Sequence, residues 1–119
     1  MDGSTGDLSK KALGAYGESL VARWYEARGY RVLARNWRCR EGEIDLIVAL
    51  ADTIVFCEVK TRRSDAFGSP AEAVGWKKQR KIRATALTWM RETGVRAAVM
   101  RFDVACVVQR RIEVIEAAF

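Results

Sequence analysis

The stretch that decides the fold is GEIDLIVALADTIVFCEVK, residues 42–60. It predicts two strands, at residues 44–50 and 53–60, with the two residues between them forming a tight turn. Apolar side chains occupy both faces of each strand, as in strands that are covered on both sides of a sheet. We therefore expect this hairpin at the centre of a layered α/β or α+β domain.

Three charged residues interrupt the apolar hairpin, namely Asp45, Glu58 and Lys60. If the turn is Ala51-Asp52, residues equidistant from it face each other, so Asp45 opposes Glu58 with Cβ atoms roughly 5 Å apart. Lys60 then lies on the same face, roughly 7 Å along the strand. A turn of three residues would shift this pairing by one position, so the register is a prediction.

Two carboxylates this close repel each other, at a cost that could reach roughly 4 kcal/mol at a separation of about 4 Å. One lysine offsets part of the repulsion, and Mg²⁺, which typically binds one or two carboxylates together with water, offsets it better. A lysine ammonium beside such an ion could orient water or stabilise developing negative charge. The alternative is an ordinary ion pair across the strand ends, which the apolar neighbours Ile47 and Phe56 on the same face disfavour.

The composition fits one globular domain, because half of the 119 residues are hydrophobic and 30% are charged. Residues 1–7 are small and polar and predict a mobile tail, which leaves a single domain at residues 8–119. The net charge of +6 favours an anionic partner such as nucleic acid. No signal peptide or membrane-length apolar stretch is recognisable, and three widely spaced cysteines favour a reducing, cytoplasmic setting.

The chain contains no histidine. This excludes Ser-His-Asp and Cys-His catalysis and His-ligated zinc. Any hydrolytic chemistry must therefore rely on carboxylates, lysine and a hard metal ion.

The other elements follow from hydrophobic periodicity and from the residues that start and stop helices. Residues 8–28 predict an amphipathic helix ended by Gly29, and residues 30–37 predict a strand. Residues 69–72, Ser-Pro-Ala-Glu, have the marks of a second helix start, and this helix could break at Gly75 and end before Gly94. Two more strands, at 97–108 and 112–117, complete the order α-β-β-β-α-β-β.

Glu18 lies on the first predicted helix, on a face whose other residues are mostly small or apolar. Its neighbours on the same helix face are Gly14, Val21, Ala22 and Tyr25, which are small or apolar apart from one hydroxyl. Glu18 is either a partly exposed carboxylate on a helix with a wide apolar face, or a third carboxylate that reaches the hairpin site.

Basic residues leave the hairpin and crowd the second long helix, where they could neutralise phosphates and steepen the salt dependence of binding. The residues that we expect to bind nucleic acid are Arg62, Arg63, Lys77, Lys78, Arg80 and Lys81. The alternative is a solvated helix face. Trp37, Trp76 and Trp89 are expected in the core or an interface rather than as surfaces for stacked bases, and Arg101 and Asp103 are interpreted as a structural pair.

The combined motifs resemble a known family. AYGESLVARWYEARGYRVLARNWR (15–38), GEIDLI (42–47), FCEVKTRR (56–63), FGSPAEAV (67–74) and RFDV (101–104) are similar to the YraN-type family of uncharacterised bacterial proteins. That family resembles the archaeal Holliday junction resolvases within the PD-(D/E)xK superfamily. The resemblance implies a restriction-endonuclease-like αβββαβ core in which helices flank a mixed sheet.

The resemblance also implies roles for particular residues. Asp45, Glu58 and the Val59 carbonyl would bind Mg²⁺, with Mn²⁺ as a substitute, and Lys60 would act on the water nucleophile. Glu18 matches the family's helix-one glutamate and would be a further catalytic residue and metal ligand. A related branch has a glutamine-tyrosine motif on the second helix, and here Gln79 has no such tyrosine, which leaves that role in doubt.

The leading hypothesis is a metal-dependent endonuclease that hydrolyses phosphodiester bonds in DNA, with a preference for a structure such as a junction or flap. One alternative is a nucleic-acid-binding module that keeps the fold without turnover, and another is a protein-interaction domain with an incidental basic face. Junction resolution needs two symmetric active sites, so it predicts a homodimer, in which Trp37 or an exposed Phe119 could lie at the interface. No membrane partner is expected.

Overall fold

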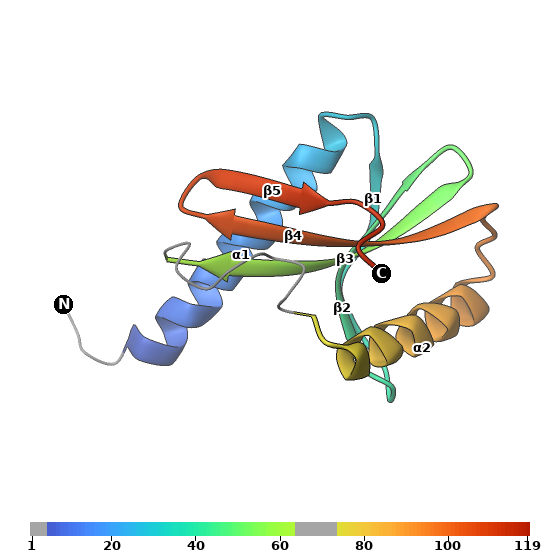
Figure 1. The fold of residues 1–119 in the computed structure, drawn as a ribbon, viewed down its shortest axis with the longest axis horizontal. Coiled ribbons are helices and arrows are strands. Elements are labelled where there is room, and N and C mark those ends of the chain that lie inside the picture. Colours follow the sequence, from blue (N-terminus) through green and yellow to red (C-terminus); the bar gives the residue numbers. More distant parts are fainter. Residues whose placement is uncertain (1–4, 64–73) are drawn as a thin grey trace.

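The computed structural model describes residues 5–63 and 74–119, with the backbone alone for residues 5–9. Its elements are α1 (Thr5–Glu26), β1 (Arg31–Arg38), β2 (Glu43–Leu50), β3 (Thr53–Arg62), α2 (Trp76–Thr93), β4 (Val99–Val108) and β5 (Arg111–Ile115) (Figure 1). This order confirms the predicted αβββαβ core and the mixed α/β class. The helix start that we expected at residues 69–72 lies outside the described residues.

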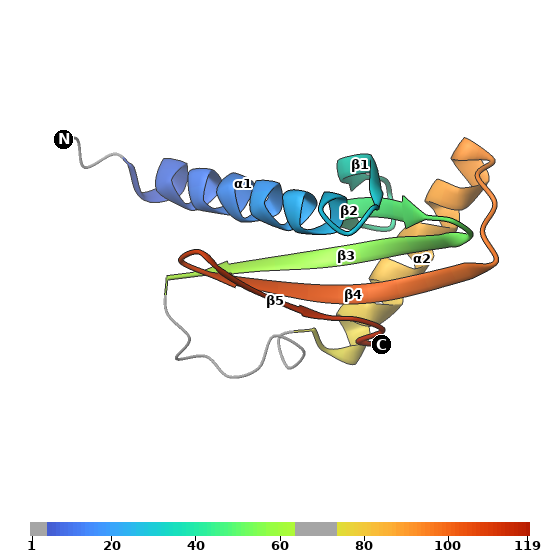
Figure 2. The same cartoon turned by 90° about the horizontal axis from the view of Figure 1, so that it is seen from above.

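The five strands form one sheet in the order β1-β2-β3-β4-β5. Neighbouring strands are antiparallel except β3 and β4, which are parallel and are joined through α2. A parallel pair needs such a crossover, because the chain must return to the same end of the sheet. As a result α1 and α2 cover opposite faces of the sheet (Figure 2).

The predicted hairpin register is confirmed. Leu50 pairs with Thr53 across the two-residue turn, and the ladder continues to Leu46 opposite Cys57. Ala51 takes a left-handed φ of 51°, as the first position of a tight hairpin turn requires.

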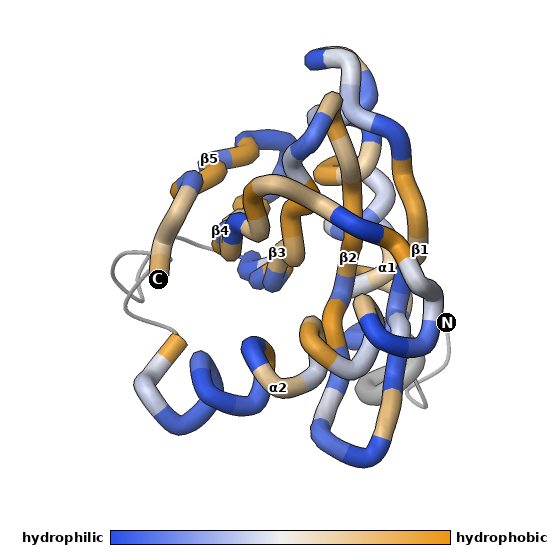
Figure 3. Tube along the Cα trace, turned by 90° about the vertical axis from the view of Figure 1, so that its right-hand side faces the viewer, coloured by the Kyte–Doolittle hydropathy of each residue, from blue (hydrophilic) through white to orange (hydrophobic). Residues whose placement is uncertain are grey.

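Two apolar cores lie on the two faces of the sheet, as the two-sided hydrophobicity of the hairpin predicts. The core on the α2 side includes Ile47, Ile54, Phe56, Ile82, Ala86 and Trp89, and the core on the α1 side includes Val21, Tyr25, Leu46, Val48, Val55 and Cys57. Figure 3 shows hydrophobic residues along the strands and hydrophilic residues along much of α2. The hairpin is therefore central and its charged residues lie in a largely buried setting.

The helix ends were predictable, and one helix start was not. Gly29 and Gly94 have φ of 92° and 70°, which favours glycine at the ends of helices. Gly75 is the N-cap of α2. However, α1 begins at Thr5, so residues 5–7, which we expected in a tail, are helical, and residues 1–4 lie outside the described part.

The large hydrophobic residues of α1 do not all lie on its buried side. Val21 and Tyr25 are fully buried, whereas Tyr16 is 41% exposed. Gly17 sets this orientation, because a Cβ there would lie 1.9 Å from Oγ1 of Thr61 on β3. Glycine lets the helix approach the sheet along this line, which also carries Glu18 toward β3.

A buried polar cluster ties α1 to β4. Asp103 is fully buried and accepts hydrogen bonds from the Tyr25 hydroxyl at 2.5 Å and from Nε and Nη2 of Arg101 at 2.9 Å each. The backbone N–H of Ala117 donates to the same carboxylate at 3.0 Å. The predicted Arg101–Asp103 pair is thus confirmed as structural.

One prediction for an aromatic residue was wrong. Phe119 is half-buried and stacks on Phe102 with ring centroids 5.3 Å apart, so it belongs to the α2-side core rather than to an exposed surface. Of the tryptophans expected in the core or an interface, Trp89 is in the core and Trp37 packs against that core, whereas Trp76 is 62% exposed and lies outside it. No helix in the described part of the chain is long and apolar enough to cross a membrane.

Candidate active site

Asp45 lies where β2 and β3 stop pairing. The backbone ladder between the two strands ends at Leu46 and Cys57. One residue further, Oδ2 of Asp45 accepts the backbone N–H of Val59 at 2.8 Å, in place of a backbone carbonyl. Because the N–H and C=O of one strand residue point to the same side, the Val59 carbonyl faces the same gap.

Glu58 is the second carboxylate of this gap and is 6% exposed. Burial is the main cause that raises the pKa of Asp45 to about 7, and the negative charge of Glu58 raises it further. The Val59 N–H lowers that pKa, while hydrogen bonding to Glu58 and the charge of Glu18 raise it. The two carboxyl groups therefore compete for charge, which is the situation that the sequence predicted.

Two lysines bind the same oxygen of Glu58. Lys60 Nζ lies 3.2 Å from Oε2, and the ammonium group of Lys78 on α2 contacts the same atom more closely. Burial lowers the pKa of Lys60, and the neighbouring Lys78 lowers it further. Burial opposes the charge on Lys78 as well, but its hydrogen bonds to Glu58 and Lys60 and the negative charges of Glu58 and Asp45 together raise its pKa.

Asp45, Glu58 and Lys78 line a cleft between the hairpin and α2. The cleft has a volume of about 160 Å³ and is lined by Gly42, Glu43, Asp45, Glu58, Lys78, Lys81 and Ile82. It is large enough for an ion and a few waters rather than for a whole nucleotide.

The donor set fits one hard divalent cation. In the part of the chain that the structure describes, no three Asp, Glu, Cys or His side chains converge as a ready-made metal cluster. Two neighbouring carboxylates and one carbonyl nevertheless match Mg²⁺, which keeps several waters and needs only one or two carboxylates. Burial and the neighbouring Glu58 oppose the negative charge of Asp45, and a bound cation would favour it.

Glu18 approaches this site without joining the cleft. It lies on α1, on the other face of the sheet, and its charge affects Asp45 less than that of Glu58 does. The structure brings Asp45, Glu58, Val59 and Lys60 together, and Glu18 remains a nearby carboxylate whose ligand role stays a prediction.

The predicted basic residues fall into three groups. Lys78 enters the cleft, while Lys77, Arg80 and Lys81 line a second hollow along α2. Arg62 and Arg63 line a separate hollow of about 390 Å³, together with Leu13, Tyr16, Gln109 and Arg110. They do not line the cleft itself.

Lys78 is the site residue whose role sequence reasoning missed. We predicted it as a phosphate contact on a solvated helix face, yet it binds Glu58. A signal was available, because Lys78 precedes the buried Ile82 by four residues and therefore shares its sheet-facing side of α2.

Comparisons with known proteins agree with the family resemblance. The family model described as uncharacterised protein family UPF0102 matches residues 17–107. A UPF0102 protein of Rhodococcus jostii (strain RHA1) is 49% identical over 113 residues, which cover 91% of this chain and 96% of the relative. A UPF0102 protein of Nocardia farcinica is 52% identical over 98 residues, which cover 82% of this chain and 77% of the relative. The matched region contains every residue of the candidate site, and the chain belongs to the UPF0102 family, the YraN-type family that its motifs resemble.

Proposed function

We propose that this protein is a metal-dependent nuclease that hydrolyses phosphodiester bonds in DNA. The observation that carries the proposal is the pair of Asp45 and Glu58, which line one cleft together with Lys78, while Lys60 binds Glu58. A charge arrangement of this kind, with strongly perturbed pKa values in a cleft, is typical of catalytic sites.

The residues that would hold Mg²⁺ or Mn²⁺ are Asp45, Glu58 and the Val59 carbonyl, with Glu18 nearby. When bound, the ion supplies positive charge that polarises a phosphoryl oxygen and makes water more acidic. Burial and the charge of Glu58 favour the protonated form of Asp45, so binding a cation there displaces a proton.

Lys60 and Lys78 supply the remaining positive charge. Both neutralise Glu58 in the structure. Both can turn to a phosphate once another positive charge neutralises Glu58. Lys60, with its lowered pKa, is suited to hold the attacking water. The water oxygen forms a bond to phosphorus, the bond from phosphorus to the sugar oxygen breaks, and the proton of the water passes to solvent or to that leaving oxygen.

A second candidate is a nucleic-acid-binding module without turnover. The specific observation in its favour is that the two lysines already balance Glu58, so the cleft is stable without a metal ion. Under this alternative the basic residues bind phosphates, and the carboxylates only position the lysines.

Cleavage of labelled DNA separates the two functions. Wild type, Asp45→Asn, Lys60→Ala and the exposed control Lys11→Ala are each incubated with four-way junction, flap, single-stranded and duplex DNA in Mg²⁺, Mn²⁺ or EDTA. We expect metal-dependent cutting by wild type and Lys11→Ala, and loss of cutting in the two site variants with binding retained. Salt-sensitive binding without cutting of any substrate would support the second candidate instead.

A further inference from the structure

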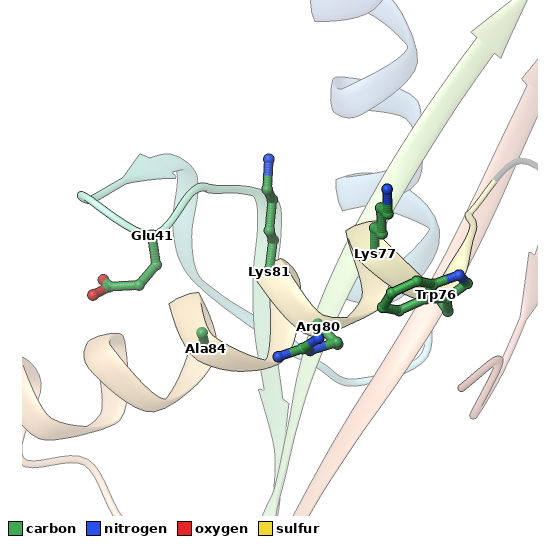
Figure 4. Close-up of a pocket in the computed structure, with 6 residues that line it drawn as sticks. All are labelled: Glu41, Trp76, Lys77, Arg80, Lys81 and Ala84. Atoms are coloured by element: carbon green, nitrogen blue, oxygen red, sulfur yellow. The ribbon is translucent and has the colours of Figure 1, made fainter.

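A second hollow adjoins the cleft along the first two turns of α2. It has a volume of about 450 Å³ and is lined by Glu41, Trp76, Lys77, Arg80, Lys81 and Ala84 (Figure 4). Lys81 lines both this hollow and the cleft that holds Asp45 and Glu58. A ligand in the hollow would therefore lie directly beside the candidate site.

Trp76 gives the hollow an open aromatic surface. It is the first residue of α2 and is 62% exposed, whereas the other three tryptophans are half-buried or buried. Covering this ring would remove apolar surface from water, which favours the binding of a partner. Lys77 Nζ lies over the ring at 5.7 Å from its centroid, and the Arg80 guanidinium lies over it at 5.9 Å.

The charges around Trp76 favour an anionic partner. Residues 76–83 contain five basic residues and no acidic one. Figure 4 shows Lys77 and Lys81 projecting from the same side of α2, with Trp76 beside Lys77. The positive end of the α2 helix dipole adds to the positive charge of these side chains.

Glu41 is the acidic residue of the hollow, and it is engaged elsewhere. Its Oε1 accepts hydrogen bonds from the Cys39 thiol and the Thr88 hydroxyl, each at 3.1 Å. These bonds lower the pKa of Glu41 and direct its carboxylate away from Trp76 (Figure 4). The charge next to the indole is therefore positive.

We propose that Trp76, Lys77, Arg80 and Lys81 form a binding site for an unpaired nucleotide, in which the base stacks on the indole and the cations contact the flanking phosphates. Aromatic rings set in a basic groove are the general means of binding single strands, because every base has a face that can stack. Bases inside a duplex have both faces covered and cannot use this surface. The proposal deepens the proposed function, on which it rests for the nucleic-acid substrate: it assigns a substrate with a single-stranded segment beside the phosphate that is cut.

Binding without metal tests the site separately from cleavage. Fluorescence anisotropy of a labelled short oligothymidylate in EDTA gives the affinities of wild type, Trp76→Ala, Trp76→Phe and Leu87→Ala. Leu87 is a matched control, because it is 53% exposed on the same helix and does not line the hollow. We expect Trp76→Ala to bind roughly 5- to 150-fold more weakly, Trp76→Phe to retain most of the affinity, and Leu87→Ala to match wild type.

Two further readouts identify stacking as the cause. On a strand of the same length without bases, wild type and Trp76→Ala should bind equally, because the indole has nothing to stack on. Trp76→Ala should leave the salt dependence unchanged, whereas Arg80→Gln should flatten the slope of log affinity against log salt by about 0.7.

The proposal fails if Trp76→Ala binds oligothymidylate as tightly as wild type does, or if it loses equal affinity for the strand without bases. It also fails if a poly-glutamate peptide competes as well as a nucleic acid of equal charge. If wild type cleaves duplex DNA but any of these three results is found, the nuclease proposal is retained and this binding site is excluded. Trp76-dependent binding of single strands without any cleavage would retain the site and exclude the nuclease.

Discussion

The substitution Asp45→Asn should stabilise the fold while it removes activity. The asparagine side chain keeps the size of the aspartate and an oxygen that can accept the Val59 N–H, but it lacks the charge that burial and Glu58 make unfavourable. Functional sites commonly retain such unfavourable charges at the expense of stability.

The expected gain in stability follows from the pKa of Asp45, which rises from 3.8 to about 7 on folding. At ~1.4 kcal/mol for each tenfold change in proton affinity, ionised Asp45 destabilises the folded state by roughly 4 kcal/mol. The folded state binds the proton more tightly than the unfolded state does, so the stability of wild type falls as pH rises from about 4 to 7 and stays low above that.

Urea unfolding in EDTA at pH 5 and pH 8 measures the effect. Linkage predicts that the free energy of unfolding of Asp45→Asn, relative to that of wild type, grows by roughly 2–3 kcal/mol between these two pH values. Saturating Mg²⁺ at pH 8 should stabilise wild type and leave Asp45→Asn unchanged, because a ligand stabilises only the state that binds it. The control Asp52→Asn removes an exposed carboxylate at the far end of β2 and should differ from wild type by less than about 0.5 kcal/mol at both pH values. An Asp45→Asn protein that is less stable than wild type at pH 8, or whose advantage is the same at both pH values, would refute the reasoning.

Three other predictions concern packing, a buried charge and the second lysine. Gly17→Ala should destabilise the protein by about 1–3 kcal/mol, because its new Cβ would lie 1.9 Å from a threonine oxygen on β3. The control Gly14→Ala meets nothing within 4 Å and should stabilise α1 by about 0.5–1 kcal/mol. Thermal unfolding compares the two variants. Asp103→Ala leaves tyrosine, arginine and backbone donors without their acceptor and should destabilise by about 3–5 kcal/mol in urea, so a loss below about 1 kcal/mol would contradict the buried cluster. Lys78→Met removes a neighbouring cation and should raise the pKa of Lys60 in an NMR titration of the lysine side chains, and an unchanged or lower value would show that the two lysines do not interact.

The hairpin and its register could be predicted because the information is local. The length of the turn fixes which residues face each other, and the apolar residues on both faces of residues 44–50 and 53–60 identify central strands. The proximity of Asp45 to Glu58 followed from the same register. The glycines that end α1 and α2 were recognisable for a similarly local reason, the left-handed backbone at Gly29 and Gly94.

Features that depend on contacts between distant elements could not be predicted in the same way. The buried stripe of α1 depends on Gly17 meeting a β3 side chain, which hydrophobic periodicity does not show. The position of Lys78 beside Glu58 depends on where the crossover places α2. Trp76 was predicted in the core or an interface, and only the position of α2 reveals that its ring is exposed.

The structure explains why a charged site can exist at the centre of an apolar sheet. β2 and β3 pair from the turn as far as Leu46 and Cys57 and then part, so that Asp45 replaces a backbone acceptor for Val59 while Glu58 remains beside it. The parallel pairing of β3 with β4 requires a crossover, and that crossover carries Lys78 over the face on which Glu58 lies. The hydrophobic contacts of the two cores stabilise the strands up to the point of separation, and the charges are confined to the gap beyond it. The same topology that gives the sheet its stability therefore leaves one gap where two carboxylates and two lysines meet.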